Sequence, residues 1–190
     1  KPKSKVLIIA GSDSSGGAGI QADIKTVTAL GSYAMTAVTA ITSQNTKGVK
    51  AISSIPVKHI QKQIIMVLDD IGANAIKIGM LHNTSIIKCI HKTLKKYKIK
   101  NVVLDPVMVS KGGSKLVNSN SIKYLKKLLL PLCDLVTPNI PEAEVLTGYS
   151  ILNKGDMIKA AKKIISMGAK SVLLKGGHLK NKMIFDILVS

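Results

Sequence analysis

Short runs of apolar, mostly β-branched residues alternate along the chain with longer amphipathic stretches. The short runs predict strands at Val6–Ala10, Met35–Thr42, Ala75–Gly79, Val102–Asp105, Leu135–Thr137, Ser171–Lys175 and, at the sheet edge, Met183–Val189. The longer stretches predict helices at Ile20–Leu30, Pro56–Ile71, Thr84–Tyr97, Ser119–Leu129, just after Pro141, and Asp156–Met167. Strands that are apolar throughout are typical of a parallel sheet with helices on both faces. The pattern predicts one α/β domain over residues 1–190.

Polar residues, glycines and prolines gather where the predicted strands end. In open parallel sheets, ligands bind beyond the carboxyl ends of the strands. The positions at those ends are Gly11, Asp13, Gln44, Gly79, Met80, Asp105–Val107, Thr137–Asn139 and Lys175–His178. A purely structural scaffold gives no reason for six such clusters, so we expect a ligand site along this edge.

The first predicted strand leads into a loop with four glycines, Gly11–Gly19, and then into a helix. Such a loop has little side-chain bulk and can fold tightly around a ligand. It is not a Walker A loop, because Gly17 and Ala18 stand where that motif needs Lys and Ser or Thr. It is a poor dinucleotide fingerprint, because no acidic residue lies between Asp23 and Asp69 to bind a ribose. A simple strand-to-helix connector remains the plain alternative.

Charge suggests a second class of function. The 190 residues carry a net charge of +18, but all 28 basic residues are lysines and only 3% of the chain is aromatic. Proteins that read nucleic acids usually use arginine for bidentate contacts and aromatic rings for stacking. The lysines are also spread over predicted helix surfaces. We therefore interpret them as a solvated basic surface and expect no nucleic-acid partner.

The remaining composition points to an ordinary intracellular protein. Cys89 and Cys133 lack metal-ligand spacing and are interpreted as reduced core thiols. No apolar run reaches the ~18 residues of a membrane span, and the first residues do not resemble a signal peptide. We expect a cytoplasmic location and no membrane partner.

A second strong motif is Thr137–Glu144, in which a predicted strand ends and Pro141 suits the first turn of a helix. Asn139 and Glu142 can face the same ligand as Asp105 on the neighbouring strand end. Their oxygen atoms suit hydrated Mg²⁺ and nucleotide phosphates. The alternative for Glu142 is compensation of the charge at a helix N-terminus.

Taken together, six blocks resemble the ribokinase-like superfamily, and within it the hydroxymethylpyrimidine/phosphomethylpyrimidine kinases of thiamine biosynthesis. The blocks are Ala10–Asp23, Thr42–Gly48, Lys77–Leu81, Val103–Met108, Thr137–Glu142 and Lys175–His178. They cover the chain in order from one end to the other. The resemblance implies a three-layer α/β/α fold with a mostly parallel sheet, and ATP-dependent phosphorylation of a pyrimidine alcohol and then of its monophosphate.

The resemblance also implies a role for particular side chains. Gly11, Ala18, Asp23, Gln44, Met80 and Val107 would bind the pyrimidine, Asn139 and Lys175 would bind ATP, and Asp105 and Glu142 would hold Mg²⁺. Gln44 suits an aminopyrimidine, because an amide offers both a donor and an acceptor to an amino group beside a ring nitrogen. A homodimer is also compatible, since members of the superfamily often pair through edge strands.

One part of the family pattern lies outside this sequence. Family members continue past the last strand to a Gly-Thr-Gly loop and a catalytic Cys or Asp, so we expect the catalytic base beyond Ser190. Phosphoryl transfer relies on positioning and charge stabilisation, but the hydroxyl proton still needs a base. We therefore expect little or no kinase turnover from a chain that ends at Ser190. The alternatives are a pyridoxal or pyridoxine kinase of the same superfamily and a non-catalytic binding domain.

Overall fold

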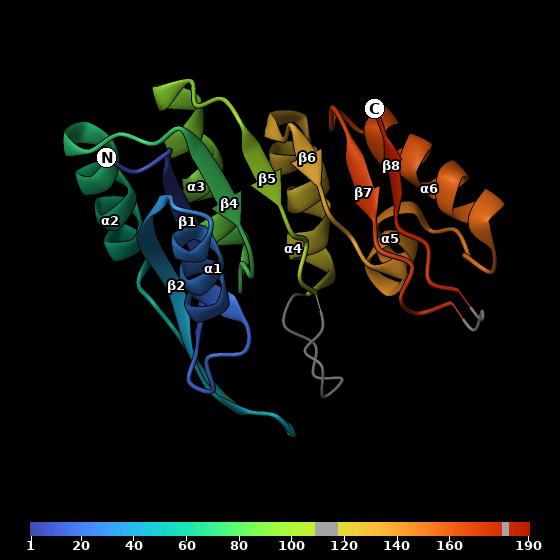
Figure 1. The fold of residues 1–190 in the computed structure, drawn as a ribbon, viewed down its shortest axis with the longest axis horizontal. Helices are drawn as coiled ribbons and strands as arrows, with labels where there is room; N and C mark the ends of the chain where they lie inside the picture. Colours follow the sequence, from blue (N-terminus) through green and yellow to red (C-terminus); the bar gives the residue numbers. More distant parts are fainter. Residues whose placement is uncertain (109–117, 180–182) are drawn as a thin grey trace.

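The computed structural model describes residues 1–108, 118–179 and 183–190, in which eight strands form one sheet in the order β3-β2-β1-β4-β5-β6-β7-β8 (Figure 1). The strands are β1 (Lys5–Asp13), β2 (Tyr33–Asn45), β3 (Gly48–Ser54), β4 (Ala75–Ile78), β5 (Val102–Leu104), β6 (Leu135–Val136), β7 (Val172–Leu174) and β8 (Ile187–Val189). The six inner strands are parallel, and β3 and β8 join the two edges in antiparallel orientation. The predicted mostly parallel α/β sheet is confirmed.

Helices cover both faces of this sheet, but unequally. They are α1 (Gly19–Ala29), α2 (Val57–Asp70), α3 (Thr84–Tyr97), α4 (Ser119–Tyr124), α5 (Ile140–Thr147) and α6 (Lys154–Ser166). Among the described residues only α1 packs on one face, over β1 and β2, whereas the main core lies between the other face and the remaining helices. On the α1 face Val103, Leu135 and Leu173 are therefore only half-buried.

Strand β1 shows how the sequence pattern produces these layers. Successive side chains of a strand point to opposite faces, so Leu7 and Ile9 join the main core while Ile8 and Ala10 pack against α1. Leu7, Ile8 and Ile9 are fully buried, and each contributes roughly 1.5–3 kcal/mol by leaving water. A run that is apolar at every position is thus explained by burial on both sides.

The predicted elements and the structure differ in three places. Strand β3 was not predicted, because Lys50, Ala51, Ser53 and Ser54 are exposed and leave no alternating pattern to detect. The predicted helix 119–129 is α-helical only in α4 and continues as a π-helix, η1 (Leu125–Leu129), and a 3₁₀ turn, η2 (Leu130–Leu132). Pro131 within that turn cannot continue an α-helix.

The last difference concerns the final strand, predicted over 183–189 but formed only by β8. Asp186, just before β8, accepts a hydrogen bond from the Gly176 N–H at 3.0 Å, so its side chain ties down the turn after β7. Both cysteines are free thiols, as expected; burial raises the pKa of Cys133 to about 12, which leaves it unreactive. None of the described helices is long and apolar enough to cross a membrane.

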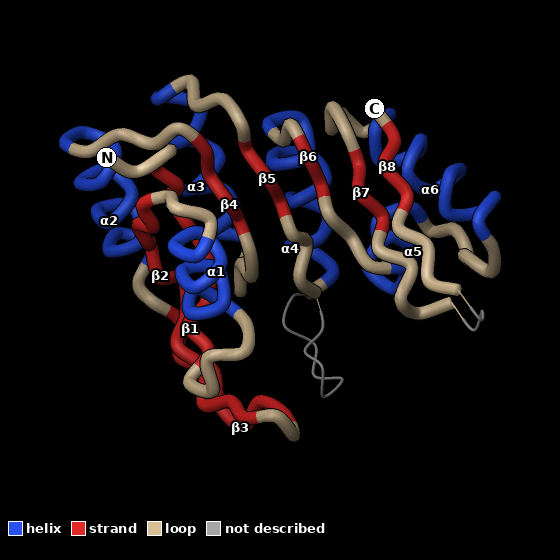
Figure 2. The backbone as a smooth tube through the Cα atoms, in the orientation of Figure 1, coloured by secondary structure: helices blue, strands red, loops and turns tan. Residues whose placement is uncertain are grey.

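The carboxyl ends of the parallel strands share one edge of the sheet, at the bottom of Figure 1. The hairpin formed by β2 and β3 projects beyond this edge (Figure 2). Because β2 is long, it carries Gln44 past the end of the sheet and over the loop that follows β1. The fold thus brings the glycine loop, the hairpin and four further strand ends together.

Candidate functional site

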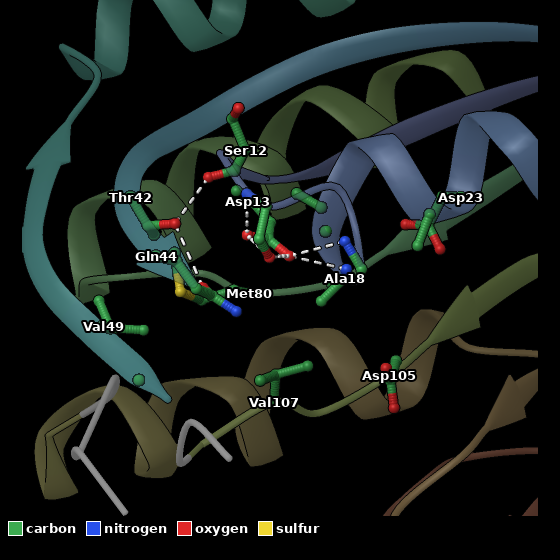
Figure 3. Close-up of a pocket in the computed structure, with 18 of the residues that line it drawn as sticks. Ser12, Asp13, Ala18, Asp23, Thr42, Gln44, Val49, Met80, Asp105 and Val107 are labelled. Atoms are coloured by element: carbon green, nitrogen blue, oxygen red, sulfur yellow. Dashed lines mark hydrogen bonds between the residues drawn. The ribbon is translucent and has the colours of Figure 1, made fainter. Parts of the chain in front are cut away.

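A pocket of about 500 Å³ lies along this edge, between the glycine loop, the β2–β3 hairpin and the ends of β4 to β7 (Figure 3). All ten residues predicted to bind substrate, ATP or metal line it: Gly11, Ala18, Asp23, Gln44, Met80, Asp105, Val107, Asn139, Glu142 and Lys175. The structure therefore brings together every predicted site residue. Their individual roles stay predictions.

The glycine loop is built around the carboxylate of Asp13, which is only 3% exposed. It accepts hydrogen bonds from the Ser15 N–H and hydroxyl, both at 2.8 Å, from the Ala18 N–H at 2.8 Å and from the Gly17 N–H at 3.1 Å. Burial alone raises the pKa of Asp13, but these donors outweigh it and the pKa falls below its usual value. Asp13 therefore holds the loop together through internal hydrogen bonds.

Close approach explains two of the glycines, by backbone at Gly19 and by the flexible end of the Met80 side chain at Gly11. Gly19 has φ = +57°, and a Cβ there would lie 2.4 Å from the Gly11 carbonyl oxygen. A Cβ on Gly11 would lie 2.7 Å from the Cε of Met80. The loop folds back on its own strand, so the absence of side-chain bulk is a requirement of the geometry and not only a convenience for the ligand.

Hydrogen bonds fix the hairpin to this loop. The Ser14 hydroxyl donates to the Gln44 carbonyl at 2.7 Å and accepts from the Gln44 N–H at 2.8 Å. The Thr42 hydroxyl lies 2.9 Å from the Ser12 carbonyl oxygen and 3.2 Å from the side-chain oxygen of Gln44. The glycine loop therefore sets the position of the side chain that is predicted to read the substrate.

Apolar side chains form the wall opposite the loop. Met80 and Ala40 are buried together, with Val107 and Ile52 packed against them. The Thr39 hydroxyl donates to the Met80 carbonyl at 2.9 Å and fixes the end of β4. Met80 and Val107 thus provide an apolar surface near Gln44, which suits a flat heteroaromatic ring.

An ion pair crosses another part of the wall. The ammonium of Lys77 lies 2.7 Å from the carboxylate of Asp23, and each side chain is about one quarter exposed. Asp23 is therefore already paired in this structure. Lys77 was not predicted as a site residue, although a single lysine inside the apolar strand β4 was a visible signal.

The polar end of the pocket is a cluster formed by Asp105, Asn139, Glu142 and Lys175, with Thr137 beside it. The Lys175 ammonium lies 3.0 Å from Asp105 Oδ1, to which the Thr137 hydroxyl also donates at 3.3 Å. Asn139 and Glu142 form a reciprocal capping box at the start of α5, with both hydrogen bonds at 2.9 Å. The helix-terminus interpretation of Glu142 is correct, and it places the carboxylate in the pocket wall.

Glu142 sits in an unfavourable electrostatic position. It is 6% exposed, and its burial is the main reason that its pKa is raised; the neighbouring Asp105 carboxylate adds to the effect. The Asn139 N–H and the Lys175 ammonium only partly offset these two causes. A further cation beside Asp105 and Glu142 would relieve the repulsion between them.

These residues fit a magnesium ion held partly through water. No group of three His, Cys, Asp or Glu side chains able to hold a metal occurs among the described residues. Mg²⁺ is, however, usually bound by one or two carboxylates, several waters and the phosphates of its substrate. The two carboxylates of Asp105 and Glu142 agree with that mode and not with an all-protein metal cage.

Sequence reasoning missed two further parts of the wall. The tip of the hairpin, residues 45–49, contributes Asn45, Thr46, Gly48 and Val49 to the pocket. Its signal was weak, since β3 is mostly exposed. Thr42 was quoted only as part of a motif, because its contact with Gln44 depends on the twist and bulge of β2 near Gln44.

Comparison with known proteins agrees with this geometry. A model of the phosphomethylpyrimidine kinase family matches residues 13–190. The chain belongs to this family. It is 47% identical over 174 residues to the hydroxymethylpyrimidine/phosphomethylpyrimidine kinase of Bacillus subtilis, covering 92% of this chain and 64% of that one. It is also 44% identical over 188 residues to the pyridoxine kinase of the same bacterium, covering 97% of this chain and 69% of that one.

A solved structure of the family has the same fold. The crystal structure of phosphomethylpyrimidine kinase from Clostridium difficile matches with a TM-score of 0.91 and 52% identity, over 98% of this chain and 80% of that one. The ribokinase-like fold inferred from the six sequence blocks is thereby confirmed. The chain spans 64% of the length of the Bacillus subtilis phosphomethylpyrimidine kinase it matches.

Proposed function

We propose that this chain is the substrate- and phosphate-binding part of an ATP-dependent kinase acting on 4-amino-5-hydroxymethyl-2-methylpyrimidine and its monophosphate. One observation carries the proposal: a single pocket joins an apolar, amide-lined end to a charged end made of Asp105, Glu142 and Lys175. The first end suits an aminopyrimidine and the second suits phosphates. Membership of the phosphomethylpyrimidine kinase family supports the same assignment.

At the substrate end, Met80 and Val107 would pack against the ring and Gln44 would bond to its amino edge. The ring's hydroxymethyl group would then face the charged end. Gly11 and Ala18 would close the other side of the ring, with the Asp23–Lys77 pair beyond them. Rigid side chains that fix the ring also fix the direction of the reacting hydroxyl, which is the main contribution a protein makes to phosphoryl transfer.

At the charged end, Lys175 and Asn139 would contact the phosphates of ATP, and Asp105 and Glu142 would hold Mg²⁺ through water. The metal would supply positive charge to the transferring phosphoryl group. Lys175 would leave Asp105 in part to meet a phosphate oxygen, since the pair is 3.0 Å apart and only partly buried.

Calorimetric titration of this chain with the aminopyrimidine, and separately with MgATP, tests the proposal. We expect both to bind, and we expect Gln44→Ala to weaken only the pyrimidine and Lys175→Ala only the nucleotide. Absence of pyrimidine binding, or of MgATP binding, would contradict the respective part of the proposal.

A pyridoxine kinase is the second candidate, favoured by the 44% identity to such an enzyme. Pyridoxine has no amino group beside a ring nitrogen, so it cannot complement an amide in the same way. Titration with pyridoxine under the same conditions separates the candidates. Binding of pyridoxine more tightly than the aminopyrimidine would favour the second.

A further inference from the structure

The Thr42 hydroxyl has a single proton but lies within hydrogen-bond distance of two neighbours. Its oxygen lies 2.9 Å from the carbonyl oxygen of Ser12 and 3.2 Å from the side-chain oxygen Oε1 of Gln44 (Figure 3). A threonine hydroxyl has one proton to donate and two lone pairs that accept. It can therefore donate to only one of the two neighbours.

The Ser12 carbonyl decides which neighbour receives the proton. A carbonyl oxygen can only accept, so the contact at 2.9 Å is a hydrogen bond only if Thr42 donates to it. The contact at 3.2 Å, described above as one to the side-chain oxygen, then needs a donor on Gln44, so the amide must be turned over to bring Nε2 to Thr42. The opposite orientation, with Oε1 toward Thr42, satisfies only one of the two contacts.

The neighbouring Gln21 shows that the donor and the acceptor of each hydrogen bond in this network can be assigned. Its Oε1 accepts from the Asp13 N–H at 2.8 Å, and a backbone N–H can only donate. Its Nε2 must then donate to the Ser12 hydroxyl at 2.7 Å. Both glutamines are thus oriented by backbone groups of the same strand end, Gln21 directly and Gln44 through Thr42.

We propose that Thr42 is a positioning residue that turns the Gln44 amide so that Nε2 bonds to Thr42 and Oε1 points into the pocket. Gln44 then presents one acceptor and one remaining Nε2–H to the ligand. A ring with an amino group beside a ring nitrogen complements this pair, whereas a ring without the amino group leaves Oε1 without a donor. The inference rests on the proposed function for its ligand, but not for the orientation of the amide.

The orientation can be tested without any ligand. A ¹⁵N-edited nuclear Overhauser spectrum of the free chain should show contact between the Gln44 side-chain amide protons and the Thr42 methyl group, with Gln44→Ala used to assign the amide signals. In the opposite orientation these protons lie on the far side of the amide. Absence of the contact would overturn the inference whether or not any pyrimidine binds.

Selectivity is tested by titration with the aminopyrimidine and with its analogue lacking the 4-amino group. Thr42→Val removes the hydroxyl and should reduce the preference for the amino compound roughly three- to tenfold, the value of about one hydrogen bond. Thr42→Ser restores the hydroxyl and should restore the preference. Thr36→Val is the matched control, because Thr36 lies on the same strand and makes no side-chain hydrogen bond to the residues described.

The two hypotheses fail in different ways. If the parent chain prefers the amino compound and Thr42→Val keeps that preference, the role of Thr42 is overturned and the proposed function stands. If the parent chain binds neither pyrimidine, the proposed function and the selectivity are overturned, while the spectrum still decides the orientation of Gln44.

Discussion

The glycine loop after β1 and the charged cluster at the start of α5 line the same pocket. Each contains a buried carboxylate, but the two surroundings shift its pKa in opposite directions. Asp13 in the loop receives hydrogen bonds from three residues, and its pKa is lowered. Glu142 in the cluster is buried beside another carboxylate, and its pKa is raised. In the loop, hydrogen bonds within the protein stabilise the charge of Asp13. In the cluster, the charges of Glu142 and Asp105 are not fully compensated, and a bound cation would compensate them.

The two regions therefore contribute differently to the pocket: the loop provides a fixed surface, and the cluster provides charged groups that can bind a ligand. A carboxylate whose hydrogen bonds are all internal stabilises a fixed surface, and the loop provides such a surface for the ring. A carboxylate held in an unfavourable field destabilises the free protein and becomes favourable when a cation binds. The contrast predicts that substitutions in the loop mainly reduce stability, whereas substitutions in the cluster mainly reduce binding.

The largest effect on stability is expected from Gly19→Ala. The new Cβ would meet the Gly11 carbonyl at 2.4 Å in a residue with φ = +57°, so the backbone itself must move. We expect the free energy of unfolding to fall by about 3 kcal/mol or more, as for other changes that force strained backbone apart. Urea unfolding measures it.

Gly148→Ala is the matched control for that substitution. Gly148 has φ = +76° but no atom within 4 Å of the position of a Cβ, so only the conformational strain remains. The expected loss is about 1 kcal/mol. Equal losses at the two positions would show that the clash between the new Cβ and the Gly11 carbonyl adds no cost of its own.

Asp13→Asn should have the next largest effect. Whichever way the amide turns, its NH₂ group faces donors from Ser15, Gly17 or Ala18, and we expect a loss of about 2 kcal/mol at pH 7. Because the pKa of Asp13 is lower in the folded state, its contribution is complete above the unfolded value of 3.8 and disappears as the pH falls through the folded value.

The stability of the two proteins should therefore converge below pH 3.8, which unfolding curves at a series of pH values can show. The chain itself becomes less stable there, so the comparison is made at low denaturant. A difference that is independent of pH would mean that the loss comes from packing and not from the charge of Asp13.

Sequence patterns predicted the parts of the molecule that depend on burial. Apolar runs such as Val6–Ala10 can only be buried on both faces, which predicted the sheet. Parallel strands place their carboxyl ends at one edge, which predicted the location of the pocket. Strand β3 escaped prediction because its residues are mostly exposed, and exposed strands carry no apolar period.

Patterns could not predict the direction of individual hydrogen bonds. The sequence places Asp13 at a strand end, but only the folded loop shows that its oxygens are used internally. It also left open whether Glu142 caps a helix or faces a ligand, and the structure places it in both the cap and the pocket wall. Lys77 gains its partner from the packing of α1 on the sheet, and Thr42 gains its partner from the pairing of β2 with β1; no local pattern contains either contact.

Glu142→Gln should change stability in the opposite sense to Asp13→Asn. Since the pKa of Glu142 is raised in the folded state, its ionised form costs stability at neutral pH, and that cost is absent below the unfolded value of 4.5. Glutamine keeps an oxygen that can accept from the Asn139 N–H. We expect a gain of about 1 kcal/mol at pH 7, as found when charge is removed from other functional sites.

Thermal unfolding at pH 7 and at pH 4 measures this gain, which should vanish at the lower pH. Glu144→Gln, on the same helix, is the control and should give no gain. MgATP binding should weaken in Glu142→Gln alone. A loss of stability in that variant would show that the capping hydrogen bond outweighs the cost of the buried charge.

The smallest effect on stability is expected from Lys175→Gln. The side chains of its ion pair with Asp105 are 40% and 26% exposed, and such partly exposed pairs contribute about 0–1 kcal/mol. Lys170→Gln breaks a comparable pair with Asp134 at 2.6 Å, far from the pocket lining, and should cost as little. Nucleotide titration then separates the two, because only Lys175 lies beside Glu142 and Asp105. If both variants bind MgATP as the parent chain does, the charged cluster is structural, and the contrast with the glycine loop fails.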